Sequence, residues 1–262
     1  MKKLITSDKN KIIKDIIKLK QKKEREKTGK FYVEGERIIN EIPSNINVEM
    51  YIFSEQFYNN LLNKDKYSYV QNIIVTNDIF KKISDTINPQ GIIAICNIPK
   101  NSIENIKINN SSFFVILDRI SDPGNMGTII RTAEALGVDT IFLSKGCVDL
   151  YNDKVIRATM GSIFHINIIE NCDLDILIDN LKENNVNVVC TYLEGGKAPY
   201  EIDFKKSTAI LIGNEANGVL EQYKNKSNEL VKIPMIGKVE SMNASISSAI
   251  IFYEVLSQRL KG

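Results

Sequence analysis

Apolar residues recur at helical spacing in segment 8–24, close to the start of the chain. The apolar positions are Ile12, Ile13, Ile16, Ile17 and Leu19. Lysines occupy the other side, and Ser7 or Asp8 stands where an N-cap residue is expected. The pattern predicts one basic amphipathic helix, and we assign residues 1–24 to it.

Short apolar runs follow, each bounded by turn residues. The pattern predicts a short strand running into a helix over 31–42, a strand over 48–54, a strand followed by a helix over 72–83, and a turn followed by a strand over 88–99. Small alternating elements of this kind predict a compact α/β module over 25–98. Residues 99–112 are polar and rich in Asn and Ser, so they are predicted to be a linker.

From residue 113 onward, apolar strands alternate regularly with helical segments. Strands are predicted in FFVIL, DTIFLS, HINII, VNVVCTYL, TAILIGN and ELVKIPM, and helices in MGTIIRTAEAL, LYNDKVIRATM, LDILIDNLKEN and ASISSAIIFYEVLSQRL. The last helix has apolar residues at Ile246, Ala249, Ile250, Tyr253 and Leu256. Alternation of this kind predicts an α/β domain over 113–262, with a mostly parallel sheet covered on both faces. Ligands of such sheets bind at the carboxyl ends of the strands.

Composition narrows the possible chemistry. The chain has 262 residues, 43% of them hydrophobic, with no apolar run as long as a membrane span and no apolar signal segment near the N-terminus. Its four cysteines are widely spaced, which argues against a zinc site or a disulfide framework and fits a reducing cytoplasm. The only histidine, His165, excludes a His dyad and is interpreted as structural. No metal is predicted.

The net charge of +2 hides an asymmetry. Residues 1–30 hold 12 Lys and Arg against 4 Asp and Glu, whereas the remaining residues hold 22 against 28. A basic end on a mildly acidic body favours a polyanionic partner, but a solvated lysine-rich helix face explains the charge equally well.

Three strand ends carry unusual polar residues. They are DPGNMGTIIR after FFVIL, GNEANGV after AILI, and IPMIGKVESMNASIS after ELVK. The first lacks the third glycine of a dinucleotide-binding fingerprint, and no P-loop lysine is present. The third combines backbone donors, an apolar wall and small polar side chains, which suits a small amphiphilic ligand such as an adenosine.

Some of these residues have simpler interpretations. Gly124 could merely make a turn, and Asn125 could merely cap the next helix. Arg131 lies off the apolar face of that helix and could pair with Glu134, a surface contact worth only a few tenths of a kcal/mol.

Taken together, the three strand ends resemble the SpoU (TrmH-like) branch of the SPOUT RNA methyltransferases. The first motif is Asn125, Gly127 and Arg131, the second Gly213, Glu215 and Gly218, and the third Ile233-Pro234-Met235, Gly237 and Ser241-Met242-Asn243. Segment 157–169 also resembles the family, with Gly161 in place but Thr159 where Ser is usual. The resemblance covers about 113–258, and the N-terminal region is similar to the substrate-binding domain of such enzymes, which resembles a small ribosomal protein.

The resemblance implies the fold, the cofactor and the reaction. It implies a C-terminal SPOUT domain with a deep trefoil knot, a homodimer with composite active sites, S-adenosylmethionine as methyl donor, and an RNA ribose 2′-hydroxyl as acceptor. The knot rests on the resemblance alone, because protein chains are ordinarily unknotted. Large-subunit ribosomal RNA is the favoured substrate and transfer RNA the alternative; a non-catalytic RNA-binding or ribosome assembly factor with the same fold is a third possibility.

The resemblance also implies roles for individual residues. Catalytic roles fall to Arg131, Asn125, Glu215, Ser241 and Asn243. Cofactor binding falls to Thr191, Leu211, Gly213, Asn214, Gly218, Ile233, Met235, Met242 and Asn243. Since a guanidinium stays protonated at neutral pH, Arg131 suits positioning a phosphate and stabilising developing alkoxide charge better than proton abstraction. Lysines of the N-terminal helix, with Lys30 and Arg37, are predicted to contact RNA phosphates.

Overall fold

The computed structural model describes residues 4–194 and 196–261 and divides into two compact units. Unit 1 comprises Met1–Lys100 together with Tyr151–Phe164, and unit 2 comprises Asn101–Leu150 and His165–Gly262. Segment 151–164, which the sequence places in the C-terminal domain, therefore packs with the N-terminal unit. There the ring of Tyr151 lies 4.6 Å from that of Phe31.

Unit 1 is built on a mixed five-stranded sheet in the order β1-β4-β3-β5-β2. Its strands are β1 (Leu4–Ile5), β2 (Lys30–Glu34), β3 (Val48–Ser54), β4 (Gln71–Val75) and β5 (Ile92–Asn97). Its helices are α1 (Lys11–Lys18), α2 (Lys22–Thr28), α3 (Glu36–Ile39), α4 (Glu55–Asn60), α5 (Asn77–Ile83) and α7 (Asp153–Thr159), with short 3₁₀ turns η1 (Asp65–Tyr67) and η3 (Ser162–Phe164). The strands and helices predicted over 31–99 are confirmed.

The prediction of a single helix over 8–24 is wrong, because the chain breaks between α1 and α2. The N-cap of α1 is Asn10, whose side chain accepts a hydrogen bond from the Ile12 amide. Buried Arg25 reaches back from α2 and donates to the Leu19 carbonyl at 2.6 Å. The break lets Leu19 join Ile13 in the core formed with the sheet, so this segment is part of the fold of unit 1.

Unit 2 is built on a six-stranded sheet in the order β11-β9-β10-β6-β7-β8, and all of its described neighbours pair in parallel. Its strands are β6 (Phe113–Leu117), β7 (Thr140–Ser144), β8 (Asn167–Cys172), β9 (Asn187–Thr191), β10 (Thr208–Ile212) and β11 (Glu229–Val231). Its helices are α6 (Pro123–Ala135), α8 (Leu174–Glu183), α9 (Glu221–Lys226) and α10 (Ala244–Leu260), with 3₁₀ turns η2 (Ile103–Asn105) and η4 (Pro199–Glu201). The parallel α/β sheet is confirmed.

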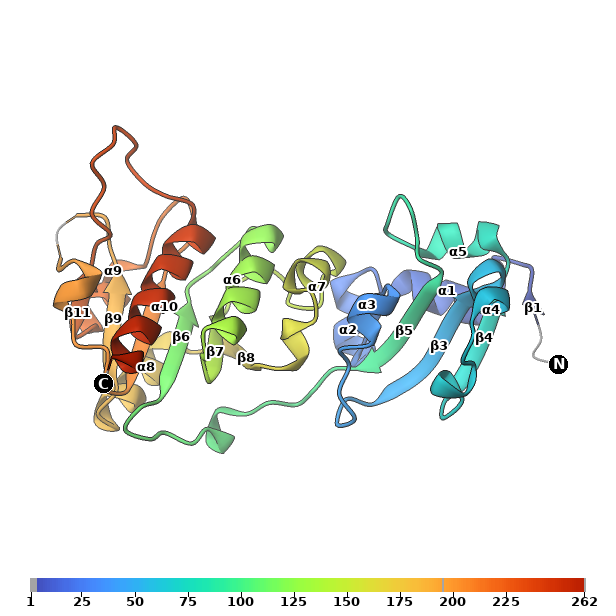
Figure 1. Ribbon diagram of the computed structural model, residues 1–262, viewed down its shortest axis with the longest axis horizontal. Helices are drawn as coiled ribbons and strands as arrows, with labels where there is room; N and C mark the ends of the chain where they lie inside the picture. Colours follow the sequence, from blue (N-terminus) through green and yellow to red (C-terminus); the bar gives the residue numbers. More distant parts are fainter. Residues whose placement is uncertain (1–3, 195, 262) are drawn as a thin grey trace. The chain divides into compact units, whose positions relative to one another are not determined.

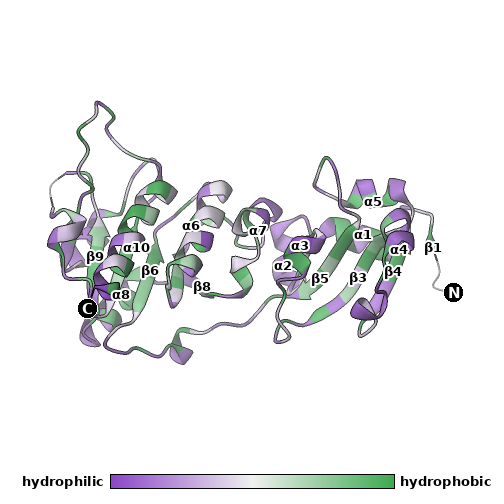
Figure 2. Ribbon diagram, in the orientation of Figure 1, coloured by the Kyte–Doolittle hydropathy of each residue, from purple (hydrophilic) through white to green (hydrophobic). Residues whose placement is uncertain are grey.

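Helices cover both faces of this sheet. Helices α6 and α10 run side by side over one face, where Phe252 of α10 meets Phe113 of β6 edge-on at 5.7 Å (Figure 1). Helix α8 packs on the opposite face, where Leu177 and Ile178 join Phe114 in a buried cluster. Strands β3, β5 and β6 are largely hydrophobic (Figure 2).

Helix α10 leaves part of its apolar surface uncovered. It buries Ile251, Phe252 and Val255. Of the apolar positions that the sequence singles out, Ile246, Ile250 and Tyr253 are 55%, 39% and 63% exposed. The segment before the helix extends away from the sheet as a long loop (Figure 1). None of the helices within the described residues combines the length and hydrophobicity that crossing a membrane needs.

Candidate active site

The three polar strand ends meet at one edge of the unit 2 sheet. They follow β6, β10 and β11, three strands of the same parallel sheet, so their carboxyl ends lie at the same edge. Together with the end of β9 they enclose a cavity of about 640 Å³. That volume falls within the range of small-molecule sites.

A chain of hydrogen bonds connects the three loops. The Asn243 side-chain amide donates to Asn125 Oδ1 at 2.9 Å, and the Asn125 amide donates to Glu215 Oε1 at 3.0 Å. The three residues come from three different motifs. In the sequence, Asn125 is 90 positions from Glu215 and 118 positions from Asn243. The cavity wall is therefore held together by the side chains that the sequence identified.

The carboxylate of Glu215 braces the loop after β6. It accepts hydrogen bonds from the Ser121 amide at 3.2 Å, the Ser121 hydroxyl at 3.1 Å and the Asp122 amide at 3.3 Å. Partial burial acts to raise the pKa of Glu215, but the hydrogen bonds from Asn125 and these backbone amides outweigh it, and the pKa lies below its ordinary value. Glu215 is thus a charged acceptor at neutral pH rather than a proton donor.

The way helix α6 is capped leaves the Asn125 side chain available for contacts with the other two loops. The interpretation of Asn125 as the helix cap is wrong, since the N-cap of α6 is Asp122, whose carboxylate accepts from the Asn125 amide N–H at 2.7 Å. Pro123 occupies the first turn, where its missing N–H costs nothing. The Asn125 side chain is therefore free to bridge Glu215 and Asn243. Asn243 itself caps α10 by accepting from the Ser245 and Ile246 amides.

The loop after β10 is closed on itself and leaves no space at its base. The backbones of Asn214 and Gly218 exchange two hydrogen bonds, of 3.1 and 2.9 Å. A Cβ on Gly213 would lie 2.1 Å from the Val219 nitrogen, which requires glycine there. Asn214 Oδ1 also accepts from the Ala216 and Asn217 amides.

Most of the residues predicted to bind a cofactor line this cavity. They are Thr191, Gly213, Asn214, Gly218, Ile233, Met235, Met242 and Asn243, and Asn125, Glu215 and Ser241 of the predicted catalytic set line it as well. Leu211 does not: its side chain is fully buried in the core, and only its carbonyl approaches the site, by accepting from the Thr191 hydroxyl at 3.1 Å.

Other lining residues were missed from the sequence. Tyr192, Leu193 and Glu194 continue from the end of β9, and Ile251 belongs to α10, whereas Ser247, which also lines the cavity, lies within the third segment IPMIGKVESMNASIS. Ligands of parallel sheets bind at the carboxyl ends of the strands, and this rule applies to β9 as much as to β10. Applied to β9, it identifies Tyr192, Leu193 and Glu194. Nothing in the sequence pattern distinguishes Ile251 from the other apolar residues of α10.

Arg131 lies outside the cavity. It is six residues beyond Asn125 on α6, roughly 9 Å further along the helix axis. Its side chain is exposed. His165 lies in an exposed turn before β8, and the described residues hold no cluster of His, Cys, Asp and Glu suited to a metal ion.

A parallel sheet with this cavity at its carboxyl edge defines an α/β protein with a site suited to a small amphiphilic ligand. Comparison with known proteins identifies the class more closely. The family model for the SpoU rRNA methylase family matches residues 112–253, and that for the MRM3-like substrate-binding domain matches residues 10–94. The chain belongs to the SpoU rRNA methylase family, which confirms the resemblance derived from its motifs.

Individual proteins that are similar to this chain are also named as methyltransferases. The chain is 35% identical over 254 residues to the 23S rRNA (guanosine(2553)-2′-O)-methyltransferase RlmP of Bacillus subtilis, covering 97% of this chain and 99% of that one. An AdoMet-bound rRNA methyltransferase structure from Sinorhizobium meliloti is 31% identical with a TM-score of 0.85, covering 97% of each chain. The SpoU methyltransferase AviRb of Streptomyces viridochromogenes, in complex with AdoMet, gives a TM-score of 0.88 at 25% identity, covering 97% of this chain and all of that one.

Proposed function

We propose that this protein transfers a methyl group from S-adenosylmethionine to a ribose 2′-hydroxyl of large-subunit ribosomal RNA. The observation that carries the proposal is the cavity in which Asn125, Glu215 and Asn243 are linked by hydrogen bonds. The relatives named for 23S ribosomal RNA favour that substrate over transfer RNA. The deep trefoil knot implied by the family remains a prediction.

S-adenosylmethionine fits the cavity in size and chemistry. Ile233, Met235 and Met242 supply apolar surface for its adenosine, and the strand-end backbone near Gly213 supplies hydrogen-bonding groups. The bound cofactor supplies an activated methyl group on its sulfonium. The protein therefore needs chiefly to align the acceptor hydroxyl, a contribution worth up to about 7–11 kcal/mol when reacting atoms are held at attack distance.

The catalytic roles divide between the cavity and Arg131. Asn125, Glu215 and Asn243 hold the three loops, and Ser241 presents a hydroxyl at the cavity wall. The exposed guanidinium of Arg131 binds the phosphate beside the target ribose and stabilises the negative charge that develops on its oxygen. Because Arg131 is not at the cavity of its own chain, we propose that it serves the cavity of a second copy.

We propose a homodimer that buries the exposed apolar stripe of α10, namely Ile246, Ile250 and Tyr253. Exposed apolar side chains at helical spacing are typical of a contact surface. Ile250→Asp is expected to lower the mass in light scattering from that of two chains to that of one 29.6 kDa chain, because the new carboxylate would be buried unpaired.

Ile176→Asp is the matched control for the dimer prediction. Ile176 is also an exposed isoleucine of unit 2, at 68%, but it lies on α8, which packs on the opposite face of the sheet. It should leave the mass of the dimer unchanged. A dimer that survives Ile250→Asp and Tyr253→Asp together would contradict the assignment of α10 to the interface.

The basic N-terminal segment is proposed to contact RNA through lysines that lack acidic partners. Lys18, Lys20 and Lys22 pair with Asp15, Asp85 and Glu26. Lys9, Lys11 and Lys23 form no side-chain ion pair with a described residue. Their positive charge is therefore available to phosphates.

Replacing Lys9, Lys11 and Lys23 with glutamine is expected to weaken RNA binding and to flatten its salt dependence. The slope of log K against log salt should fall by up to about 0.7–0.9 for each RNA phosphate that is no longer neutralised, measured by titration across salt concentrations. Lys18→Gln with Lys22→Gln, which removes charges already paired within their own helices, should change the slope less. Equal slopes for all proteins would favour the solvated-face interpretation.

The function itself is tested by incubating the purified protein with labelled S-adenosylmethionine and total RNA, followed by mapping of the methylated ribose. Methylation of large-subunit ribosomal RNA is expected. Label confined to transfer RNA would support the alternative substrate. Donor and RNA binding without any transfer would support a non-catalytic RNA-binding or assembly role.

A further inference from the structure

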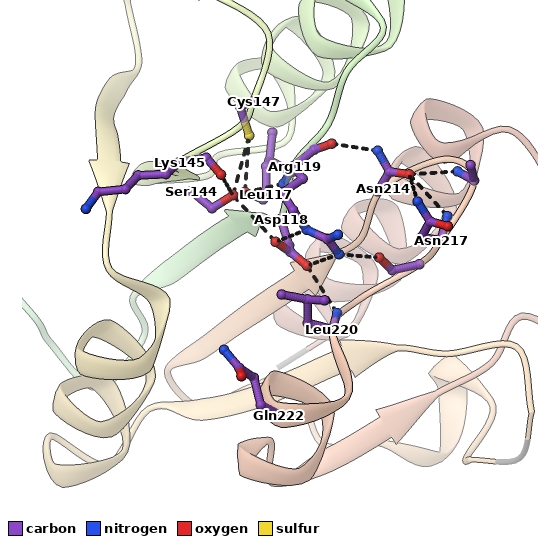
Figure 3. Close-up of polar contacts among 12 residues, drawn as sticks. Leu117, Asp118, Arg119, Ser144, Lys145, Cys147, Asn214, Asn217, Leu220 and Gln222 are labelled. Carbon is purple, nitrogen blue, oxygen red and sulfur yellow. Dashed lines mark hydrogen bonds and ion pairs between the residues drawn. The ribbon is translucent and has the colours of Figure 1, made fainter.

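The turn after β6 places two charged residues against the loop that follows β10. Asp118 and Arg119 do not line the 640 Å³ cavity, but Arg119 contacts Asn214 and Gly218 of the Gly213–Val219 segment that forms one of its walls, and Asp118 contacts Leu220 just beyond that segment (Figure 3). Neither residue belongs to the three motifs considered above.

The Arg119 side chain links a buried carboxylate to the loop. Its Nε and Nη2 donate to Asp118 Oδ1 and Oδ2, both at 2.9 Å, and Nη2 also donates to the Gly218 carbonyl at 3.2 Å. Asp118 is only 1% exposed, and its Oδ2 accepts from the Leu220 amide at 3.1 Å. The pair thus holds the loop at its far end. A planar guanidinium with several donors suits this arrangement better than a lysine ammonium.

The backbone of Arg119 holds the near end of the same loop. Its φ of 55° is a left-handed conformation that costs a non-glycine residue of order 1 kcal/mol. It is maintained because the Arg119 N–H donates to Ser144 Oγ at 2.9 Å and its carbonyl accepts from Asn214 Nδ2 at 2.8 Å. A single residue therefore contacts the loop at both Asn214 and Gly218.

We infer that Arg119, oriented by Asp118, is a positioning residue that holds the Gly213–Val219 wall in the shape that binds the methyl donor. This inference rests on the proposed function. Releasing Gly218 should let the wall adopt other conformations, and the donor must then reorder it on binding. Affinity for the donor should fall, whereas affinity for RNA should not, because neither residue is part of the proposed RNA contacts.

The test is Arg119→Ala, with S-adenosylmethionine binding measured by calorimetry and RNA binding measured separately. The donor Kd is expected to rise about tenfold or more, and the RNA Kd to stay within about twofold. Added guanidinium ion, well below denaturing concentrations, should restore much of the donor affinity by occupying the vacated position between Asp118 and Gly218. Sodium chloride at the same concentration should not restore the donor affinity.

A surface ion pair of the same unit supplies the control. Lys226 contacts Asp175 at 3.1 Å and Asp179 at 2.8 Å, away from the cavity lining. Lys226→Ala should leave the donor Kd unchanged with or without guanidinium. It therefore distinguishes removal of the Arg119 bridge from removal of any ion pair in unit 2.

Two results would overturn the inference. One is a wild-type donor Kd in folded Arg119→Ala; the other is a weakened Kd that follows a lowered melting temperature and does not respond to guanidinium. Should Arg119→Ala fail to fold, Arg119→Lys is measured instead, since lysine cannot hold both Asp118 oxygens and Gly218, and wild-type affinity there would be equally contrary. A wild-type protein that binds no donor would instead defeat the proposed function itself.

Discussion

Arg131→Ala is expected to lower the rate of methyl transfer by on the order of 10² to 10³ or more while leaving S-adenosylmethionine affinity unchanged. The reason is positional: Arg131 is exposed and lies outside the cavity, so its loss removes a charge that acts on the RNA and not a wall of the donor site. Single-turnover transfer with saturating RNA measures the first quantity, and calorimetry measures the second.

Glu134→Ala is the matched control for Arg131→Ala. It lies one turn further along the exposed side of α6, and full transfer activity is expected. If Arg131 acted only as half of a surface ion pair, the two variants would behave alike, since such pairs contribute only a few tenths of a kcal/mol. Arg131→Ala with wild-type transfer would refute the role assigned to this residue.

The elements that were predicted correctly are those whose residues are buried, because burial requires apolar side chains and so leaves a pattern in the sequence. Strands β6 and β10 are buried at every residue, and their apolar runs give their bounds directly. Helix α9 has no buried residue and β1 has only two residues, so neither leaves a periodic pattern to detect. The break between α1 and α2 was missed because Arg25, a charged residue, is buried there by its bond to a backbone carbonyl.

The position of the candidate site could be predicted from the sequence, but the contacts of its individual side chains could not. Parallel strands must present their carboxyl ends at one edge, so polar residues after β6, β10 and β11 could be expected to converge. Which side chain caps α6 depends on whether Asp122 or Asn125 reaches the first-turn amides, and both are good caps. Leu211 was misplaced because it lies within β10, where its side chain is directed into the core before the chain reaches the cavity.

Gly213→Ala is expected to abolish donor binding, raising the Kd by at least about a hundredfold. The added methyl group would lie 2.1 Å from the Val219 nitrogen and 2.2 Å from the Gly218 carbonyl carbon, and backbone atoms cannot move aside as a side-chain end can. The loop that carries Glu215 would have to open. Gly237→Ala is the control, because a Cβ there meets no atom within 4 Å, and it should bind the donor normally. Wild-type affinity in Gly213→Ala would mean that this loop does not form the donor site.

Mixing the two inactive variants distinguishes a composite site from an independent one. In a dimer of one Arg131→Ala chain and one Gly213→Ala chain, the first contributes an intact cavity and the second an intact Arg131. If Arg131 serves its partner's cavity, random mixing should restore about one quarter of the wild-type rate, because half of the dimers then carry one complete site of two. If Arg131 serves its own cavity, no dimer in the mixture holds a complete site, and transfer should stay at the background of the separate variants.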